Sequence, residues 1–504
     1  MHRAVVTLDP AFAVAPVHRR TFGSFVEHLG RCVYTGIHEP DHPSADEDGF
    51  RGDVLALTRE LGVSTVRYPG GNFVSGYRWE DGVGPVEQRP RRRDLAWHST
   101  EPNTVGLDEF VRWAGKAGAE PMLAVNLGTR GMADALDLLE YANLPPGTAL
   151  ADRRVANGAR EPYGVRMWCL GNEMDGPWQI GHKTAAEYGR LAAETARAMR
   201  KLDPDLELVV CGSSHSRMPT FAEWEATVLA EAYDDVDFVS LHAYHHPVDG
   251  DVGSFLAAAV DMDTMIDAVV ATADHVGAKL RSRKKIMLSF DEWNVWYQDR
   301  HRAAGLPSDW PVAPRLLEDV YDVTDAVVVG SLLISLLRHS DRVTAAAQAQ
   351  LVNVIAPIRT EPGGPAWRQT IFHPFALTSR YARGEVLRVE PRAPAYETAR
   401  YGPVPVLAAV GTWDAETGEA VLFAVNRDQA EPIVLDVDLR AVRVSAVLEA
   451  VTLADADRTA RNTADRPDRV VPRPNASADL VDGHLRMELP PVSWSMLRLG
   501  PRPS

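Results

Sequence analysis

The sequence predicts an α/β fold, a (β/α)8 TIM barrel with a C-terminal all-β sandwich. From about residue 20 to 355, eight β-prone runs alternate with helical patterns, which is typical of parallel strands joined by right-handed crossovers. Beyond about residue 385, short β-prone runs are separated only by turn residues, which indicates a sandwich. We expect residues 16–385 to form the barrel and residues 386–504 to form a jelly-roll-like sandwich, completed by an N-terminal strand in residues 1–15.

The β-prone run at residues 4–14 has no neighbour to pair with locally, so it is expected to join the distant sandwich. The strands of the barrel are expected at residues 22–28, 63–70, 121–127, 165–172, 206–213, 236–244, 285–292 and 343–352. The last of these is rich in alanine and also fits a helix.

Helical patterns separate the strands, and the clearest covers residues 184–202. Thr184 and Glu187 have the spacing of a capping box at its start, and an apolar stripe with helical spacing follows. Further helices are expected at residues 52–61 and 316–338.

The C-terminal part alternates as strands with one buried face do. Leu485, Met487 and Leu489 are separated by polar residues, which predicts a half-buried strand. Residues 454–478 are rich in Asp, Arg, Asn and Pro and are expected to form a long exposed loop.

The composition excludes several classes of function. Because the net charge is −16, no surface for nucleic acid or an anionic membrane is expected. No apolar run reaches the roughly 20 residues of a membrane-spanning helix, and the N-terminal residues do not follow a signal-peptide pattern. Cys32, Cys169 and Cys211 have neither the number nor the spacing of a disulfide framework or zinc site. We therefore expect reduced, buried thiols in a cytoplasmic protein.

Two glutamates follow strand-like apolar runs. Residues 165–170 (VRMWCL) are followed by a glycine and then by Asn172 and Glu173. Residues 286–290 (IMLSF) are followed by Asp291 and Glu292. The carboxyl ends of TIM-barrel strands meet at one mouth, where catalytic groups lie. Either glutamate alone fits a salt bridge at the end of the barrel, but two such strand ends, each beside aromatic residues, favour a shared catalytic pocket.

Two facing carboxylates suit glycoside hydrolysis. In a retaining enzyme they lie about 5–5.5 Å apart, one as acid/base and the other as nucleophile, so one must stay protonated while the other is ionised. Glu173 has the more apolar neighbours in sequence, including Met174, Pro177 and Trp178. We therefore assign Glu173 as the acid/base and Glu292 as its partner.

Longer strings carry a family resemblance. Asn172 and Glu173 after the fourth strand, with Glu292 after the seventh, resemble the retaining glycosidases of clan A. Six longer strings together make the chain look like a member of glycoside hydrolase family 51, the α-L-arabinofuranosidases. The resemblance is strong over residues 15–380 and looser in the sandwich. The strings that carry the resemblance are FGSFVEHLGRCVYTGI, VRYPGGNFVSGYRWEDGVGP, WCLGNEMDGPWQIGHKTAAEYG, LHAYH, DEWNVWY and QLVNVIAPI.

The resemblance implies roles for individual residues. Glu173 would be the acid/base, Glu292 the nucleophile, Asn172 a ligand of the sugar 2-hydroxyl, and Tyr244 a residue that orients the nucleophile. The side chains that would bind or enclose the sugar are Glu27, Asn72, Trp97, Trp296 and Gln350.

Several of these residues also fit structural roles. Asn72 follows two glycines and fits a turn, and Tyr244 fits core packing. Trp97 fits a loop residue that closes the barrel. Gln350 depends on the strand register, because Gln348 precedes it by two positions.

A histidine cluster, His242, His245 and His246, is followed by two aspartates. On a strand this spacing does not place the rings on one face, so no metal site and no cofactor are expected. His242 is expected to line the substrate pocket. Asp291 is expected to point to the opposite face of its strand from Glu292 and to form an ion pair.

The sequence thus predicts a cytoplasmic, retaining, exo-acting α-L-arabinofuranosidase of arabino- and arabinoxylo-oligosaccharides, and the resemblance implies a homo-oligomer, a hexamer. Two alternatives remain. One is a clan A glycosidase of another linkage, such as a β-xylosidase or an endo-β-glucanase. The other is a non-catalytic sugar-binding module, against which the presence of both carboxylates argues.

Overall fold

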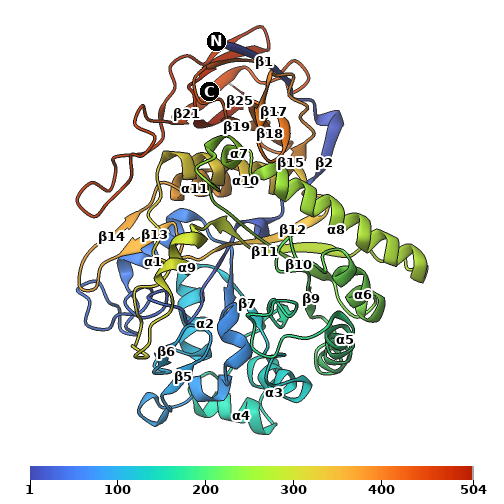
Figure 1. The fold of residues 1–504 in the computed structure, drawn as a ribbon, viewed down its shortest axis with the longest axis vertical. Coiled ribbons are helices and arrows are strands. Elements are labelled where there is room, and N and C mark those ends of the chain that lie inside the picture. Colours follow the sequence, from blue (N-terminus) through green and yellow to red (C-terminus); the bar gives the residue numbers. More distant parts are fainter. Residues whose placement is uncertain (502–504) are drawn as a thin grey trace.

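The protein, in a computed structural model that describes residues 1–501, is a closed eight-stranded barrel joined to a β-sandwich (Figure 1). All neighbouring strands of the barrel are parallel, as the alternating pattern predicts. In order around the barrel the strands are β3 (Gly23–Phe25), β4 (Thr65–Tyr68), β7 (Glu120–Ala124), β8 (Met167–Leu170), β9 (Glu207–Cys211), β10 (Phe238–His245), β11 (Met287–Val295) and β12 (Val343–Ala349). The alanine-rich eighth run is therefore a strand.

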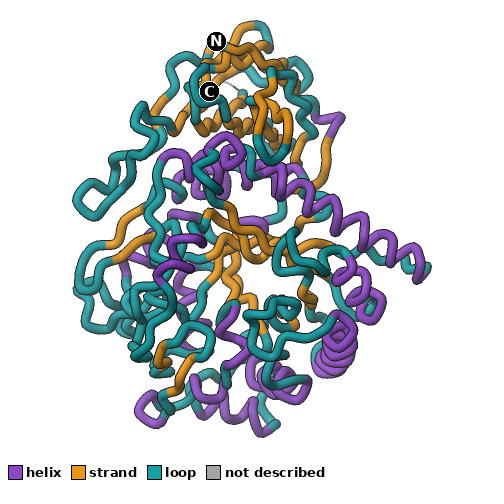
Figure 2. Tube along the Cα trace, in the orientation of Figure 1, coloured by secondary structure: helices purple, strands orange, loops and turns teal. Residues whose placement is uncertain are grey.

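Helices surround this barrel, and strands gather in its centre and in the sandwich (Figure 2). The α-helices are α1 (Gly52–Leu61), α2 (Leu107–Ala117), α3 (Met132–Asn143), α4 (Ala149–Ala156), α5 (Ala185–Leu202), α6 (Glu223–Ala232), α7 (Val252–Leu256), α8 (Ala259–Leu280), α9 (Gln298–Ala304), α10 (Val323–Arg338) and α11 (Phe372–Tyr381). Short 3-10 helices cover Pro10–Phe12, Arg19–Phe22, Asn72–Gly76, Trp79–Gly82 and Val86–Gln88. Within residues 1–501, none of the helices combines the length and apolarity that a membrane crossing needs.

Helix starts follow the side chains that cap them. Thr184 accepts a hydrogen bond from the Glu187 backbone, and the Glu187 carboxylate accepts one from the Thr184 backbone, which confirms the capping box of α5. The helix predicted over residues 316–338 is wrong at its start, because α10 begins at Val323. Asp322 caps it by accepting hydrogen bonds from the two backbone N–H groups at positions 324 and 325, which would otherwise be unsatisfied.

The sandwich consists of two sheets. One has the order β1 (His2–Thr7), β20 (Ile433–Asp438), β24 (His484–Leu489) and β23 (Asp479–Val481). The other has the order β2 (Ala13–Pro16), β15 (Glu385–Leu387), β18 (Leu407–Asp414), β19 (Glu419–Asn426), β25 (Ser493–Gly500), β21 (Ala446–Leu453) and β22 (Arg473–Pro474). Two-stranded hairpins lie elsewhere: β5 (Arg92–Asp94) with β6 (Ser99–Glu101), β13 (Ile358–Thr360) with β14 (Ala366–Arg368), and β16 (Ala395–Thr398) with β17 (Gly402–Pro405).

The N-terminal segment contributes to both sheets of the sandwich. β1 pairs in parallel with β20, and β2 pairs antiparallel with β15. The predicted N-terminal strand is therefore two strands. Residues 454–478 are mostly irregular, as predicted, but they are not wholly exposed: Asn462 is buried and exchanges hydrogen bonds with the backbone of Val470.

Helix α10 joins the two domains, since it contacts barrel strands on one side and β18, β19 and β25 on the other. Its Gly330 lies directly beneath the Trp494 ring of β25, where a Cβ atom would come within 2.2 Å of Trp494 Cδ1. This close approach requires glycine.

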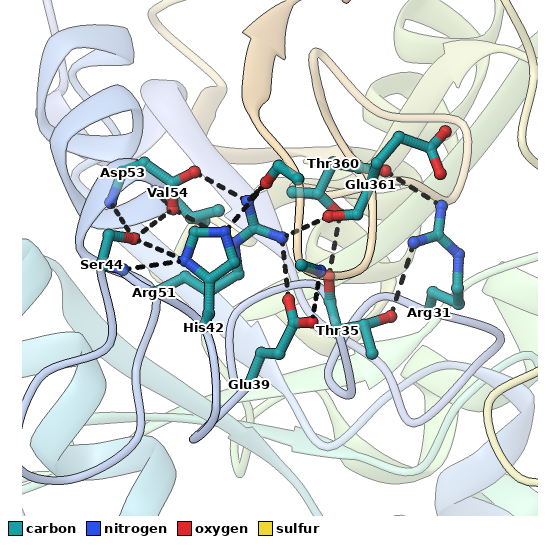
Figure 3. Close-up of polar contacts among 12 residues, drawn as sticks. Arg31, Thr35, Glu39, His42, Ser44, Arg51, Asp53, Val54, Thr360 and Glu361 are labelled. Atoms are coloured by element: carbon teal, nitrogen blue, oxygen red, sulfur yellow. Dashed lines mark hydrogen bonds and ion pairs between the residues drawn. The ribbon is translucent and has the colours of Figure 1, made fainter.

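The rim of the barrel is held by a polar network between residues 31–53, which follow β3, and the β13–β14 hairpin, which follows β12 (Figure 3). At its centre, the buried Arg51 donates to Glu39 Oε2 at 2.9 Å and to the carbonyl oxygens of Glu361 and Gly364 at 2.9 and 2.6 Å. Asp53 accepts from the same guanidinium at 2.7 Å. Loops far apart in the sequence thereby form one edge of the mouth.

Candidate active site

A cavity of about 570 Å³ lies at the carboxyl ends of the barrel strands. Its floor includes Glu173 and Glu292, so the two glutamates predicted from separate strand ends share one pocket. The other predicted residues that line it are Glu27, Asn72, Trp97, Tyr244, Trp296 and Gln350.

Glu173 follows β8 in a strained backbone conformation, with φ of +44°. A non-glycine residue in this region costs of order 1–3 kcal/mol and is held by its surroundings. Its Oε1 lies 2.9 Å from His242 Nδ1, and its Oε2 accepts a 2.6 Å hydrogen bond from Trp178 Nε1. Both carboxylate oxygens are therefore held in place from different elements.

Glu292 lies in β11 and is bound from two sides. Arg67 Nη1 donates to Oε1 at 2.8 Å, and the Tyr244 hydroxyl donates to Oε2 at 2.8 Å. Arg67 is buried within β4, and its other terminal nitrogen donates to Asn172 Oδ1 at 2.7 Å. One cation thus orients both Glu292 and Asn172.

The expectation that Asp291 points away from Glu292 is wrong, because β11 contains a bulge. Ser240 pairs with Ser289, whereas His242 pairs with Glu292, so β11 has one residue more than β10 over this interval. Asp291 and Glu292 therefore both face the interior of the barrel. The Asp291 carboxylate accepts from the Ser240 hydroxyl at 2.5 Å and lies 3.0 Å from His242 Nε2, so the expected ion pair is with His242 on the inner face.

His242 lies beneath the two glutamates and does not line the open cavity as expected; it is 2% exposed. Burial disfavours its charge, but Glu292, Asp291 and Glu173 outweigh this and raise the pKa of His242 to about 10. The ring is therefore cationic at neutral pH and donates from both nitrogens, to Glu173 and to Asp291. Burial raises the pKa of Asp291, but the positive charges of Arg67 and His242 outweigh burial and leave this pKa below its usual value.

The two glutamates are close enough to act on one bond. One carboxylate oxygen of Glu173, one of Glu292 and a ring nitrogen of His242 all lie within 4.8 Å of one another. Burial raises the pKa of Glu173, and the charge of Glu292 raises it further, whereas hydrogen bonds from His242 and Trp178 oppose the shift. A raised pKa favours a protonated carboxyl group, the form that a general acid needs.

Glu27 stands at the centre of a second group. It accepts hydrogen bonds from the Phe73 backbone at 3.0 Å, from Trp97 Nε1 at 3.0 Å and from Gln350 Nε2 at 2.8 Å. Burial raises its pKa to about 7. Gln350, and not Gln348, faces the cavity, because Gln348 is fully buried and donates to Asn294.

Two buried polar atoms near the glutamates have no partner in the protein. They are Asn172 Nδ2 and Gln350 Oε1. Buried polar groups are normally hydrogen-bonded, so these atoms suit the hydroxyl groups of a bound sugar. Trp296, which packs edge-on against Tyr244 with ring centroids 5.1 Å apart, adds an apolar wall.

The other histidines of the sequence cluster do not converge on one point. His246 lies 3.4 Å from Asp299, while the carboxylate of Asp251 caps α7. Among residues 1–501, the groups of three potential metal ligands are Glu173 with His242 and Glu292, and residues 46–48. The first group contains the two candidate catalytic glutamates and His242, which hydrogen-bonds to Glu173, and the second is paired with Lys116.

Arg67 is a residue of the site that the motifs do not indicate, although its position in the sequence carries a signal. Arg67 stands between Val66 and Tyr68 in a short buried strand, and a lone charge in such a strand requires a partner. The role of Asp291 was hidden, since only the bulge turns it inward. The three cysteines are free and buried, as expected.

Comparison with known proteins identifies a family. Models of the "Alpha-L-arabinofuranosidase 1 domain" and the "Alpha-L-arabinofuranosidase C-terminal domain" match residues 57–263 and 291–493. An intracellular exo-α-(1→5)-L-arabinofuranosidase of Streptomyces lividans is 63% identical over 500 residues, which cover 99% of this chain and 75% of that protein. An exo-α-(1→6)-L-arabinofuranosidase of Bifidobacterium longum is 56% identical over 98% of this chain and 97% of that protein.

Solved structures extend the agreement to the fold. A family 51 α-L-arabinofuranosidase from Bifidobacterium longum has a TM-score of 0.95 and 51% identity, covering 99% of this chain and all of that one. An α-L-arabinofuranosidase from Thermotoga maritima, described as an arabinose complex, has a TM-score of 0.87 and 33% identity over 99% of this chain and all of that one. The chain is a glycoside hydrolase, and it belongs to the α-L-arabinofuranosidases of glycoside hydrolase family 51.

Proposed function

We propose that this enzyme is a retaining, exo-acting α-L-arabinofuranosidase that removes terminal non-reducing arabinofuranosyl residues from arabino- and arabinoxylo-oligosaccharides. The observation that carries the mechanism is the approach of Glu173 and Glu292 oxygens to within 4.8 Å. This close approach of two oxygens favours the carboxyl separation of retaining enzymes, roughly 5–5.5 Å, over the roughly 6.5–9.5 Å of inverting ones.

In the first step, Glu292 attacks the anomeric carbon and Glu173 protonates the departing glycosidic oxygen. Arg67 and Tyr244 hold the two oxygens of Glu292, which restricts the nucleophile to one orientation. The raised pKa of Glu173 keeps its proton available for the leaving group. The products are a covalent arabinosyl-enzyme and the free aglycone.

In the second step, water attacks the anomeric carbon of the intermediate, and Glu173, now a carboxylate, takes its proton. The C–O bond to Glu292 breaks, which restores the nucleophile and releases arabinose with its original anomeric configuration. His242 stays cationic beneath both glutamates, so it stabilises the negative charge that passes between them.

The sugar would be bound by the group around Glu27 and by Asn172. Glu27 and Gln350 offer oxygen and nitrogen atoms to the sugar hydroxyls, Asn72 lies beside them, and Trp97 and Trp296 enclose the ring. The names of the Streptomyces lividans and Bifidobacterium longum relatives support exo-action on α-L-arabinofuranosides. Relatives named as intracellular support a cytoplasmic location.

A panel of aryl glycosides tests the linkage. We expect rapid release of 4-nitrophenol from the α-L-arabinofuranoside and little from the β-xyloside or β-glucoside. Rapid cleavage of the β-xyloside without cleavage of the α-L-arabinofuranoside would overturn the proposal. Sugar binding without any turnover would favour a non-catalytic module.

Sedimentation analysis of the purified protein tests the expected homo-oligomer. A monomer in solution would contradict this expectation.

The variant Glu173→Ala tests the assignment of the acid/base. Aryl glycosides with good leaving groups need little protonation, so their first step should be almost unchanged, whereas poor leaving groups should lose about 10²–10⁴-fold. The second step should be slow and should be accelerated by azide, with arabinosyl azide of retained configuration as product. Equal losses for good and poor leaving groups would contradict the assignment.

A further inference from the structure

The side of the cavity that receives the leaving group can be identified from the acid. Because Glu173 protonates the glycosidic oxygen, the aglycone lies on the Glu173 side of the pocket. Trp178 donates to Glu173, is 47% exposed and lines the cavity. His215 stacks on it, with ring centroids 6.1 Å apart and 15° between the planes. We call Trp178, Ser214, His215 and Arg217, all of which line the cavity, the aglycone wall.

Arg217 is the charged residue of this wall. It follows β9, is exposed, and lines the cavity. Among residues 1–501, no carboxylate lies within ion-pairing distance of its guanidinium, which also forms no hydrogen bond to the protein. By contrast, Arg315 on another side of the cavity is paired with Glu318 and Glu361.

His215 lies within the electrostatic reach of two cations, Arg217 and Arg302, and of two carboxylates, Asp175 and Asp261. Burial lowers the pKa of His215, and the charges of Arg217 and Arg302 lower it further. The charges of Asp175 and Asp261 oppose this shift. The Arg302 side chain lines the same cavity from α9.

The acidic residues near the wall are already engaged. Asp175 accepts from the backbone and the hydroxyl of Ser214, and Asp261 accepts from Ser216 at 3.4 Å. Asp299 lies 3.4 Å from His246 and 3.7 Å from Arg302. The serine groups leave the charges of Asp175 and Asp261 in place, but among residues 1–501 neither carboxylate lies within ion-pairing distance of the Arg217 guanidinium, which faces the cavity without a partner.

We propose that the aglycone wall accepts aglycones that carry a carboxylate, such as a uronic acid, and that Arg217 binds this carboxylate. A planar guanidinium can form two parallel hydrogen bonds to a carboxylate, while Trp178 offers an apolar face to the adjoining sugar ring. The protein as a whole has a net charge of −16 and repels anions, so a local cation is needed to admit one. This inference rests on the proposed function, because the acid defines the aglycone side.

The test compares two matched glycosides, 4-carboxyphenyl and 4-carbamoylphenyl α-L-arabinofuranoside, which differ in charge but little in shape. The measured quantity, within each protein, is kcat/KM for the 4-carboxyphenyl glycoside divided by kcat/KM for the 4-carbamoylphenyl glycoside. Any effect of a substitution that is common to both substrates cancels in this ratio. Arg217→Gln should lower the ratio by about three- to tenfold at low ionic strength. Arg217→Lys keeps the positive charge and should keep most of the wild-type ratio. The matched surface variant is Arg190→Gln on α5, which removes an arginine that pairs with Glu194 and should leave the ratio unchanged.

The preference should also weaken in about 0.5 M salt, where the Debye length is only a few ångströms. Equal ratios in the wild type and Arg217→Gln at low salt would overturn the inference. Failure of the wild type to hydrolyse the neutral glycoside would instead contradict the proposed function. In that case, calorimetric Kd values for the corresponding thioglycosides give the same comparison without turnover. Weaker preference for the carboxylate in Arg217→Gln than in the wild type would support the inference, and equal preference would overturn it.

Discussion

Arg67 and Arg51 are both buried cations, with 1% and 0% of their surfaces exposed, yet their surroundings differ. Arg51, on the rim, binds two carboxylates and two backbone carbonyl oxygens. Arg67, in the barrel, binds Glu292 and Asn172, and its guanidinium also lies 4.9 Å from the centre of the Phe25 ring.

The partners of the two arginines account for the difference in role. Those of Arg51 belong to the loop after β3, the first turn of α1 and the β13–β14 hairpin, which the cation joins together (Figure 3). Those of Arg67 keep atoms for another molecule: Asn172 Nδ2 has no partner in the protein, and Glu292 lines the cavity. Buried polar groups are normally satisfied, so an unpartnered amide beside a carboxylate that lines the cavity indicates that Arg67 organises a binding site rather than a structural network.

Replacing Arg67 should have the largest effect. Arg67→Met removes the cation that orients Glu292 and Asn172, so kcat/KM should fall by about 10²–10³-fold. The measurement is kcat/KM for 4-nitrophenyl α-L-arabinofuranoside, expressed per folded molecule after denaturant melting. A loss of less than about fivefold would contradict the proposed role of Arg67.

Arg51→Met is the matched variant on the rim. It leaves Glu39 and Asp53 without their shared cation, so the free energy of unfolding should fall by about 2–4 kcal/mol. The kcat/KM of the molecules that remain folded should change by less than about twofold. Urea titration and activity measured on the same samples separate these quantities. A large loss of kcat/KM with unchanged stability would remove the distinction between the two arginines.

Expressed as free energy, His242→Gln should have the smallest effect, about 1.4 kcal/mol for a tenfold loss of kcat/KM, and it sharpens the comparison within the site. His242 lowers the pKa of Glu173, so its replacement should raise that pKa. Because Glu173 must be protonated to act as an acid, activity falls as pH rises through this pKa, and the alkaline limb of kcat/KM should move to higher pH. Activity at the optimum should fall about tenfold, since Glu173 loses a bond that orients it.

The pH profile of kcat/KM, measured with a poor leaving group, checks this prediction. An alkaline limb that stays in place or moves to lower pH would show that His242 does not control the proton of Glu173. The same profile with a very good leaving group is the control, because its first step needs little protonation.

Most of the barrel could be predicted because strands buried on both faces form short apolar runs between amphipathic helices. Glu173 and Glu292 could be placed in one mouth for the same reason, since each follows such a run. The start of α10 could not be placed from its apolar pattern, because the cap at Asp322 decides where the helix begins.

The sequence by itself determined the fold class, the shared pocket of Glu173 and Glu292, and the family. Only the tertiary structure decided which neighbouring groups serve those glutamates. The bulge in β11 turns Asp291 inward beside His242, and strands distant in sequence bring Arg67 against Glu292. The reason is physical: side-chain alternation is local and can be read along the chain, whereas registers and contacts between strands depend on how the whole barrel closes.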